Sequence, residues 1–154
     1  MSAGKFWAKH TQNEDEIQTC FSIRESVFVK GQNVPPEEEW DHLDQAPQVC
    51  PHFIAYFEAA NGIRTAIGAA RLWLYKDDCS KAQRVAVLDT WRKKGVGRLL
   101  MATMETFSKQ TGRNEVVLGA QTHAIPFYES IGYQAFGPVY LDAGIPHRDM
   151  FKKI

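Results

Sequence analysis

The stretch VAVLDTWRKKGVGRLL, residues 85–100, begins as an apolar strand and continues as a helix, with two glycines near the join. Amides in the first turn of a helix lack partners within the helix and lie at the positive end of its dipole. Glycines at that position let a phosphate group approach several of these amides together. Arg92, Lys93 and Arg98 add positive charge nearby. The stretch therefore predicts an anion site between a strand and a helix.

Two common phosphate-binding loops do not fit this stretch. The Walker pattern GxxxxGK[ST] is absent, and the dinucleotide fingerprint needs a third glycine where Leu100 stands. ATP and NAD are therefore disfavoured as ligands. Gly95 and Gly97 alone also have a simpler explanation, because glycines let a helix pack tightly on a strand while the basic side chains face water. The rest of the chain has to decide between the two explanations.

Strands and helices alternate along the chain. Alternating apolar residues and turn signals predict strands, and apolar residues at helical spacing predict helices. We expect strands at 5–11, 52–58, 64–75, 84–88, 115–120, 133–141 and 147–154, and helices at 14–28, 95–112 and 123–131. Asn13 is suited to cap the first helix, and Asn61 and Gly62 to supply the positive-φ residues of a hairpin turn. The polar segment 30–51 predicts a long loop or a short helix that begins near Pro36.

This order of elements predicts a single α/β domain over residues 1–154. Its sheet should be mixed, with parallel pairing across each helical crossover. A chain of 154 residues with 44% hydrophobic content is long enough to bury one core. Its 18 basic and 18 acidic residues balance, so no overall field favours nucleic acid or an anionic membrane as a partner.

The cysteines and histidines give no sign of a metal site or of disulfides. Cys20, Cys50 and Cys79 are far apart and lack CxxC spacing, and the five histidines show no HExxH pattern. No apolar run has the length of a membrane span, and the first residues lack the apolar centre of a signal peptide. We therefore expect a soluble, cytoplasmic protein with reduced thiols.

Several motifs resemble those of the GNAT superfamily of N-acetyltransferases. RKKGVG, residues 92–97, matches the signature R/Q-x-x-G-x-G/A and lies between a strand and a helix, as in that family. QTHAIPFYESIGY, residues 121–133, is similar to its second signature, N-x-x-A-x-x-F-Y-x-x-x-G-F, with Gln121 in the Asn position. The VF-x-x-x-Q-x-V-P stretch at 27–35 and the GIPH turn at 144–147 resemble the ElaA-like branch of small bacterial members.

The resemblance implies the GNAT fold, in which the fourth and fifth strands splay apart, and acetyl-CoA as the co-substrate. The pantetheine arm would pair with the free strand edge at Val85 and Val87, and the Val87 amide would point at the thioester oxygen. Amides from Lys94 to Arg98 would hold the pyrophosphate. The cofactor-binding residues implied are Val85, Val87, Arg92, Lys93, Lys94, Gly95, Val96, Gly97, Arg98, Gln121, Phe127 and Tyr128.

Acetyl transfer from a thioester to a protonated amine needs a base and an acid. Tyr128 stands in the family's F-Y position, and its phenol is the candidate acid for the departing thiolate. The alternative is a core aromatic whose hydroxyl bonds to the backbone. Glu39, in the acidic run with Glu38 and Asp41, is a candidate base or amine attractor, although such a run can simply be solvated.

Histidine is a residue type suited to proton transfer, so His147 in the GIPH turn is a further candidate, but a hydrogen-bonded histidine in a turn is the favoured explanation. His123 could act near the thioester or merely cap the short helix. We expect direct transfer in a ternary complex, without a covalent acyl-enzyme, to a small-molecule or peptide amine. The alternatives are a CoA-binding sensor with little turnover and a transferase of another acyl group. The exposed last strands would suit a homodimer.

Overall fold

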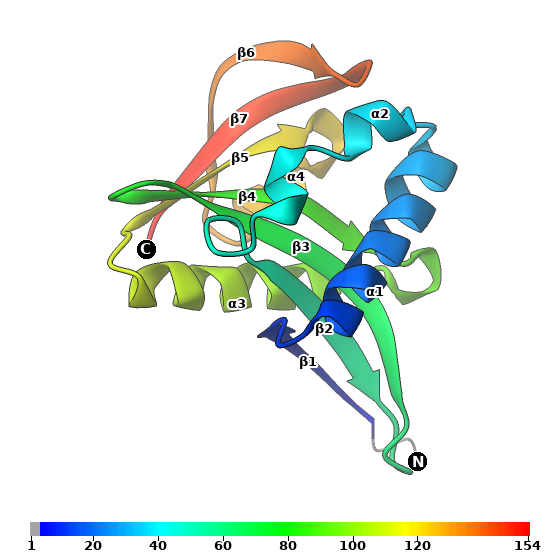
Figure 1. The fold of residues 1–154 in the computed structure, drawn as a ribbon. Helices are drawn as coiled ribbons and strands as arrows, with labels where there is room; N and C mark the ends of the chain where they lie inside the picture. Colours follow the sequence, from blue (N-terminus) through cyan, green and yellow to red (C-terminus); the bar gives the residue numbers. More distant parts are fainter. Residues whose placement is uncertain (1–3) are drawn as a thin grey trace.

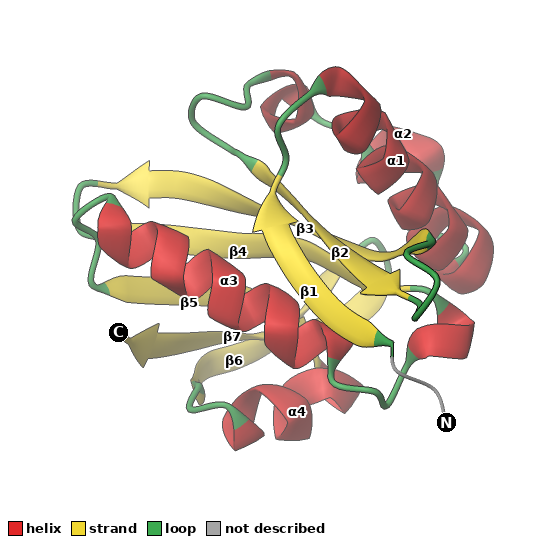
Figure 2. Cartoon of the chain, turned by 90° about the horizontal axis from the view of Figure 1, so that it is seen from below, coloured by secondary structure: helices red, strands yellow, loops and turns green. Residues whose placement is uncertain are grey.

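The computed structural model describes residues 4–154, which fold around a seven-stranded mixed sheet (Figures 1 and 2). The start of the expected domain, at residue 1, lies outside this range. The strand order is β1-β2-β3-β4-β5-β7-β6. The strands are β1 (Lys5–His10), β2 (His52–Glu58), β3 (Arg64–Lys76), β4 (Cys79–Val87), β5 (Glu115–Gln121), β6 (Gln134–Asp142) and β7 (Ile145–Lys153).

Helices cover both faces of the sheet. The main helices are α1 (Glu14–Arg24), α2 (Pro36–Glu39), α3 (Val96–Gln110) and α4 (Ile125–Ser130). A π-helical segment, η1 (Glu25–Lys30), extends α1, and the 3₁₀ turns η2 (His42–Gln45), η3 (Asp89–Trp91) and η4 (Thr122–Ala124) join other elements. Figure 2 shows α3 lying across one face, and Figure 1 shows α1 on the other.

The core follows the alternation of side chains along the central strands. In β2, Phe53 and Ala55 belong to the cluster under α3, which contributes Leu100 and Met104. Ile54, between them, packs in a second cluster with Cys20 of α1. The sheet is therefore buried on both faces at its centre, as its apolar strands require.

Several local predictions are confirmed. The Asn13 side chain accepts a hydrogen bond from the Glu16 amide at 2.9 Å, so it caps α1 as expected. The short helix α2 begins at Pro36. The hairpin between β2 and β3 also forms, but of its two turn residues Gly62 alone has a positive φ, of +85°. Asn61 instead accepts a hydrogen bond from the Ile63 amide through its side chain.

Parallel pairing is more restricted than predicted. Among the described strands, β4 and β5 pair in parallel across α3, and every other neighbouring pair is antiparallel. The segment between β1 and β2 returns the chain to the same end of the sheet, where the Thr11 amide donates to the His52 carbonyl at 3.0 Å. β7 occupies the place beside β5 and leaves β6 at the edge. The prediction of parallel pairing at these two crossovers is therefore wrong.

No helix within residues 4–154 combines the length and the apolar character that crossing a bilayer requires. The three cysteines are buried and free. Strand β4 begins at Cys79 rather than at the expected Arg84, because its polar first half pairs with β3 as a hairpin.

Candidate active site

Strands β4 and β5 separate after a short stretch of pairing. They pair at Cys79↔Glu115, Ser80↔Val116 and Lys81↔Val117. Beyond that point β4 carries one extra residue in its pairing with β3, and Arg84 has a φ of +56° there. A bulge of this kind bends a strand and increases its twist. The bulge thus lies where β4 separates from β5, and this separation is the splay that the resemblance implied.

The amides of Val85 and Val87 point into the gap between the two strands. Hydrogen bonds alternate in direction along an antiparallel strand. The Leu88 amide donates to the Ile67 carbonyl of β3 at 2.9 Å, and the register makes Ala86 the next residue bonded to β3. Val85 and Val87 therefore turn their amides away from β3. This free edge can accept an added extended chain.

The start of α3 adjoins this edge. Gly95 precedes the helix with a φ of +84°, where a side chain would be strained. The Leu99 amide donates to the Gly95 carbonyl at 3.0 Å and is the first amide bonded within the helix. The amides of Val96, Gly97 and Arg98 are thus left without helical partners. Their arrangement is suited to a phosphate group.

A pocket of about 890 Å³ connects the helix start with the strand gap. Its volume is in the range of small-molecule and cofactor sites. The predicted site residues that line it are Val85, Val87, Arg92, Lys93, Gly95, Val96, Gly97, Arg98, Gln121, Phe127, Tyr128, Glu39 and His147. Lys94 is exposed and does not line it. The structure therefore brings nearly all of the predicted residues into one cavity.

Tyr128 stands in the pocket wall with its ring packed edge-on against Phe127 and Tyr133. Its hydroxyl makes no hydrogen bond to any residue between 4 and 154, so the expected alternative of a backbone-bonded core tyrosine lacks its hydrogen bond. Burial raises the pKa of Tyr128 to about 12. The phenol is therefore protonated throughout the neutral range.

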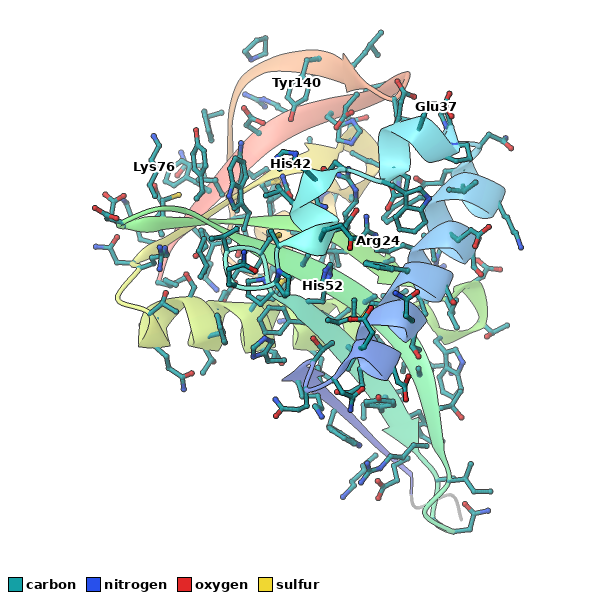
Figure 3. All side chains as sticks on the ribbon, in the orientation of Figure 1. Arg24, Glu37, His42, His52, Lys76 and Tyr140 are labelled. Carbon is teal, nitrogen blue, oxygen red and sulfur yellow. The ribbon has the colours of Figure 1, made fainter. Side chains whose placement is uncertain are left out.

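Glu39 lies in a buried cluster of three arginines and three carboxylates, here called the charge network. Its members are Arg24, Arg71, Arg84, Glu39, Asp41 and Asp44. The Arg24 guanidinium lies 2.8 Å from one Glu39 oxygen, and Arg84 lies 3.4 Å from the other. Figure 3 shows Arg24 between α1 and the α2 segment. Arginines thus contact both oxygens of the Glu39 carboxylate, which the sequence analysis named as a candidate base.

The charge network holds the polar segment 36–45 against α1, β3 and β4. Arg71, buried in β3, bonds Asp41 at 2.7 Å and Asp44 at 2.8 Å. Although burial raises the pKa of Asp41, the hydrogen bonds and charge of Arg71 lower it to about 2. Burial raises the pKa of Glu39 despite the attraction of Arg24 and Arg84. Two members of the network, Glu39 and Arg84, line the pocket.

His147 lies on β7, next to Gln121 of β5 in the sheet register. Its Nδ1 lies 2.7 Å from the Ile145 carbonyl, which can only accept, so Nδ1 carries the proton and Nε2 is free to accept. Its ring stacks on Tyr140, whose hydroxyl donates to Asp149 at 2.7 Å. His147 thus has the hydrogen bond that was expected of a turn histidine, but it lies within β7 rather than in the turn, and it lines the pocket.

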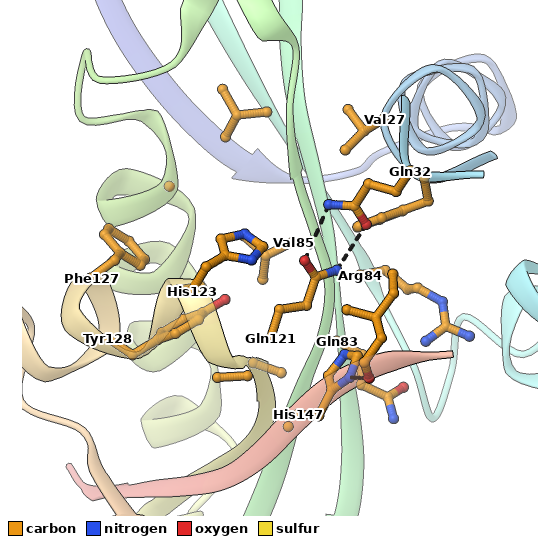
Figure 4. A pocket seen from close by; sticks show the side chains of 18 of the residues that line it. Val27, Gln32, Gln83, Arg84, Val85, Gln121, His123, Phe127, Tyr128 and His147 are labelled. Atoms are coloured by element: carbon orange, nitrogen blue, oxygen red, sulfur yellow. Dashed lines mark hydrogen bonds between the residues drawn. The ribbon is translucent and has the colours of Figure 1, made fainter. Parts of the chain in front are cut away.

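Gln121 pairs with a residue that the motif analysis left without a role. Its Nε2 donates to the Gln32 Oε1 at 2.8 Å, and the Gln32 Nε2 donates to the Gln121 Oε1 at 3.2 Å (Figure 4). We call this reciprocal contact the amide bridge. His123 is exposed and also lines the pocket.

Sequence reasoning missed the charge network, Gln32 and the Tyr140–Asp149 pair. Gln32 had a signal, because it lies inside the VF-x-x-x-Q-x-V-P stretch. Tyr140 and Asp149 had none, since their contact depends on how β6 and β7 pair. Arg24 and Arg71 look like solvated surface residues until the fold buries them to 1% exposure.

The splayed strands, the free edge of β4 and the amides at the start of α3 define the fold of acyl-CoA N-acyltransferases. Comparisons agree with this class. The acetyltransferase (GNAT) domain profile matches residues 47–154. The chain is 40% identical to the uncharacterized N-acetyltransferase YjcF of Bacillus subtilis over 142 residues, which cover 92% of this chain and 95% of that one.

Two crystal structures are similar to the chain over nearly their whole length. Escherichia coli ElaA has a TM-score of 0.78 and 26% identity, with 97% of this chain and 99% of that one covered. An acyl-CoA N-acyltransferase from Pseudomonas aeruginosa has a TM-score of 0.76 and 26% identity, with 96% and 99% covered. The chain belongs to the GNAT family and is an N-acetyltransferase that depends on an acyl-CoA. The resemblance stated from the motifs is confirmed.

Proposed function

We propose that this protein, as a single domain, transfers an acetyl group directly from acetyl-CoA to a primary amine. The observation that carries the proposal is the continuity of the pocket. It runs from the unpaired amides at the start of α3, along the free edge of β4, to the unbonded hydroxyl of Tyr128. The pocket can therefore hold a phosphate group, an extended arm and a reacting carbon one after another along its length.

The chain has suitable groups for each part of acetyl-CoA. Amides from Gly95 to Arg98 would bind the pyrophosphate, with the side chains of Lys93 and Arg98 close by. The amides of Val85 and Val87 would bond the pantetheine arm, as an added strand does. An arm that leaves α3 reaches Val87 before Val85, so the Val85 amide, rather than the expected Val87 amide, would lie by the thioester oxygen and favour negative charge there during attack. The bound thioester supplies an activated acetyl group.

Tyr128 is the proposed donor to the departing sulfur. A hydroxyl without a protein partner is free to hydrogen-bond a ligand atom in the pocket. Its pKa of about 12 keeps it protonated at neutral pH, although it makes the phenol a weaker acid than an ordinary tyrosine. Tyr128 would thus act by donating a hydrogen bond as negative charge grows on the sulfur.

His147 is the proposed base for the incoming amine. An ammonium group must lose a proton before its nitrogen can attack. The Nε2 of His147 has a lone pair, while the Glu39 carboxylate is held by Arg24 and Arg84. In this proposal, Glu39 therefore has a structural role in the lining of the pocket. The proton passes from the amine to His147, directly or through a water molecule.

Two measurements test the proposal. A ligand that binds only the folded state adds about 2.7 kcal/mol of stability at a hundredfold excess over its Kd, so acetyl-CoA should raise the melting temperature. The release of CoA thiol should then be assayed over a broad panel of amines. Absence of any shift at millimolar acetyl-CoA in low salt would remove the co-substrate assignment. A shift without turnover on any amine would favour a CoA-binding sensor.

A further inference from the structure

The amide bridge spans the pocket from wall to wall. Gln32 follows η1 on one side, and Gln121 is the last residue of β5 on the other. Each side-chain amide uses one N–H and its oxygen in the bridge, at 2.8 and 3.2 Å. Both side chains are half-buried and both line the pocket. The bridge therefore places two hydrogen-bonded side-chain amides across the inside of the cavity.

The bridge lies at a defined point along the free edge of β4. Reading away from α3, the edge presents Val87, then Val85, then the bulge at Arg84. Figure 4 shows the two amides meeting beside Val85, with Phe127, His123 and Tyr128 to one side and Gln83 and His147 to the other. An arm that starts from the phosphate site and follows this edge passes Val87 before it reaches the bridge.

The cavity does not end at the bridge. Lys81, Ala82 and Gln83 of β4 also line it, and the gap between β4 and β5 closes only where Lys81 pairs with Val117. A chain that could pass the bridge would thus find space beyond it. The bridge, rather than the end of the cavity, limits how far a ligand extends along β4.

We propose that Gln32 sets the length of the acyl group that the protein accepts. This inference rests on the proposed binding of acetyl-CoA along β4. A two-carbon acyl group would stop at the bridge, whereas a longer aliphatic group would have to part the two amides. Such a group has no polar atom to replace the lost hydrogen bonds, and it would cover the half-buried amides so that water could not replace them either, which is costly. The pocket thereby selects acetyl over longer acyl groups.

The test compares the binding of CoA, acetyl-CoA and butyryl-CoA by calorimetry, so it needs no knowledge of the acceptor. In the wild type, butyryl-CoA should bind no more tightly than acetyl-CoA. Gln32→Ala removes the bridge from the η1 wall and opens the space beyond it. The ratio of butyryl-CoA to acetyl-CoA affinity should then rise about sixteenfold, because butyryl has two more CH₂ groups and each one that leaves water favours binding by about fourfold.

Gln18→Ala is the matched control. Gln18 is an exposed glutamine of α1 whose side chain bonds Glu14, so this variant should keep the wild-type ratio. Gln32→Ser is a second variant that opens the bridge, should Gln32→Ala fail to fold. If acetyl-CoA binds and the ratio stays within twofold of wild type in the folded variant, Gln32 does not set the chain length. If no CoA compound binds the wild type, the proposed function itself is wrong.

Discussion

The ring of Phe127 stands 3.2 Å from the point that a β-carbon on Gly97 would occupy. Gly97 lies in the first turn of α3, and Phe127 lies in α4, so this contact joins the proposed phosphate site to the element that carries Tyr128. A β-carbon at this position would be crowded, although Phe127 is only half-buried and has room to shift. The absence of a side chain at residue 97 therefore suits the packing against Phe127, and in the proposed function it also leaves room for a phosphate group.

Gly97→Asp should abolish acetyl-CoA binding in a protein that still folds. The carboxylate would stand where phosphates approach, whereas a negative charge in the first turn of a helix favours the helix itself. We expect a loss of more than a hundredfold in affinity by calorimetry, with a cooperative melting transition. Gly97→Ala is the control for crowding and should cost much less affinity. Wild-type affinity in folded Gly97→Asp would place the anion site elsewhere.

Asp41→Asn should lower the free energy of unfolding at neutral pH and make it depend less on pH in acid. Because Asp41 has a lowered pKa, its carboxylate contributes stability that is present above its ordinary pKa near 3.8 and is lost as the pH falls toward about 2. The wild type should therefore lose free energy of unfolding between pH 4 and pH 2 more steeply than Asp41→Asn does. Denaturant titrations at fixed pH values measure this difference.

Glu37→Gln is the matched control for Asp41→Asn. Glu37 is an exposed carboxylate of α2 and has no ion pair among the described residues (Figure 3). Its removal should leave the slope of stability against pH close to that of the wild type. Equal slopes for the wild type and Asp41→Asn would mean that the Arg71 contact does not hold in solution.

The sequence predicted those parts of the fold that depend on neighbouring residues. The Asn13 cap, the start of α2 at Pro36 and the turn from β4 to α3 each follow from interactions a few positions apart. Most of the candidate residues found in the pocket came instead from the resemblance of two motifs to those of a known family. The parallel pairing was mispredicted for two reasons: the connection after β1 returns to the same end of the sheet, so β2 runs antiparallel, and β7 inserts between β5 and β6.

The charge network could not be predicted in this way. It joins residues between 15 and 45 positions apart, such as Arg24 with Glu39 and Arg84 with Glu39. Composition alone favours exposed positions for such side chains, and only the packing of segment 36–45 onto β3 buries them. Glu39 does line the pocket, but the sequence could not show that two arginines hold it.

Glu39→Gln should therefore affect stability more than chemistry. Removing the carboxylate charge leaves Arg24 and Arg84 less well paired in a buried setting, which costs about 1–3 kcal/mol of unfolding free energy. Turnover at saturating substrates should stay within a few-fold of wild type when measured below the melting transition. A loss of ~10² to 10⁴-fold in kcat without a stability change would instead make Glu39 the general base.

Tyr128→Phe should lower kcat while leaving acetyl-CoA affinity and melting temperature nearly unchanged. The phenylalanine ring keeps the edge-on packing with Tyr133, and the lost hydroxyl has no described protein partner. Loss of a proton donor in the transition state typically costs ~10² to 10⁴-fold. Tyr133→Phe is the control: it removes a hydroxyl that donates to Glu105 at 2.8 Å, so it should cost about 1 kcal/mol of stability and spare kcat. Equal, small effects of both variants on kcat would mean that the Tyr128 ring only packs and that water or His123 protonates the sulfur. The double variant Tyr128→Phe/His123→Ala would then distinguish water from His123.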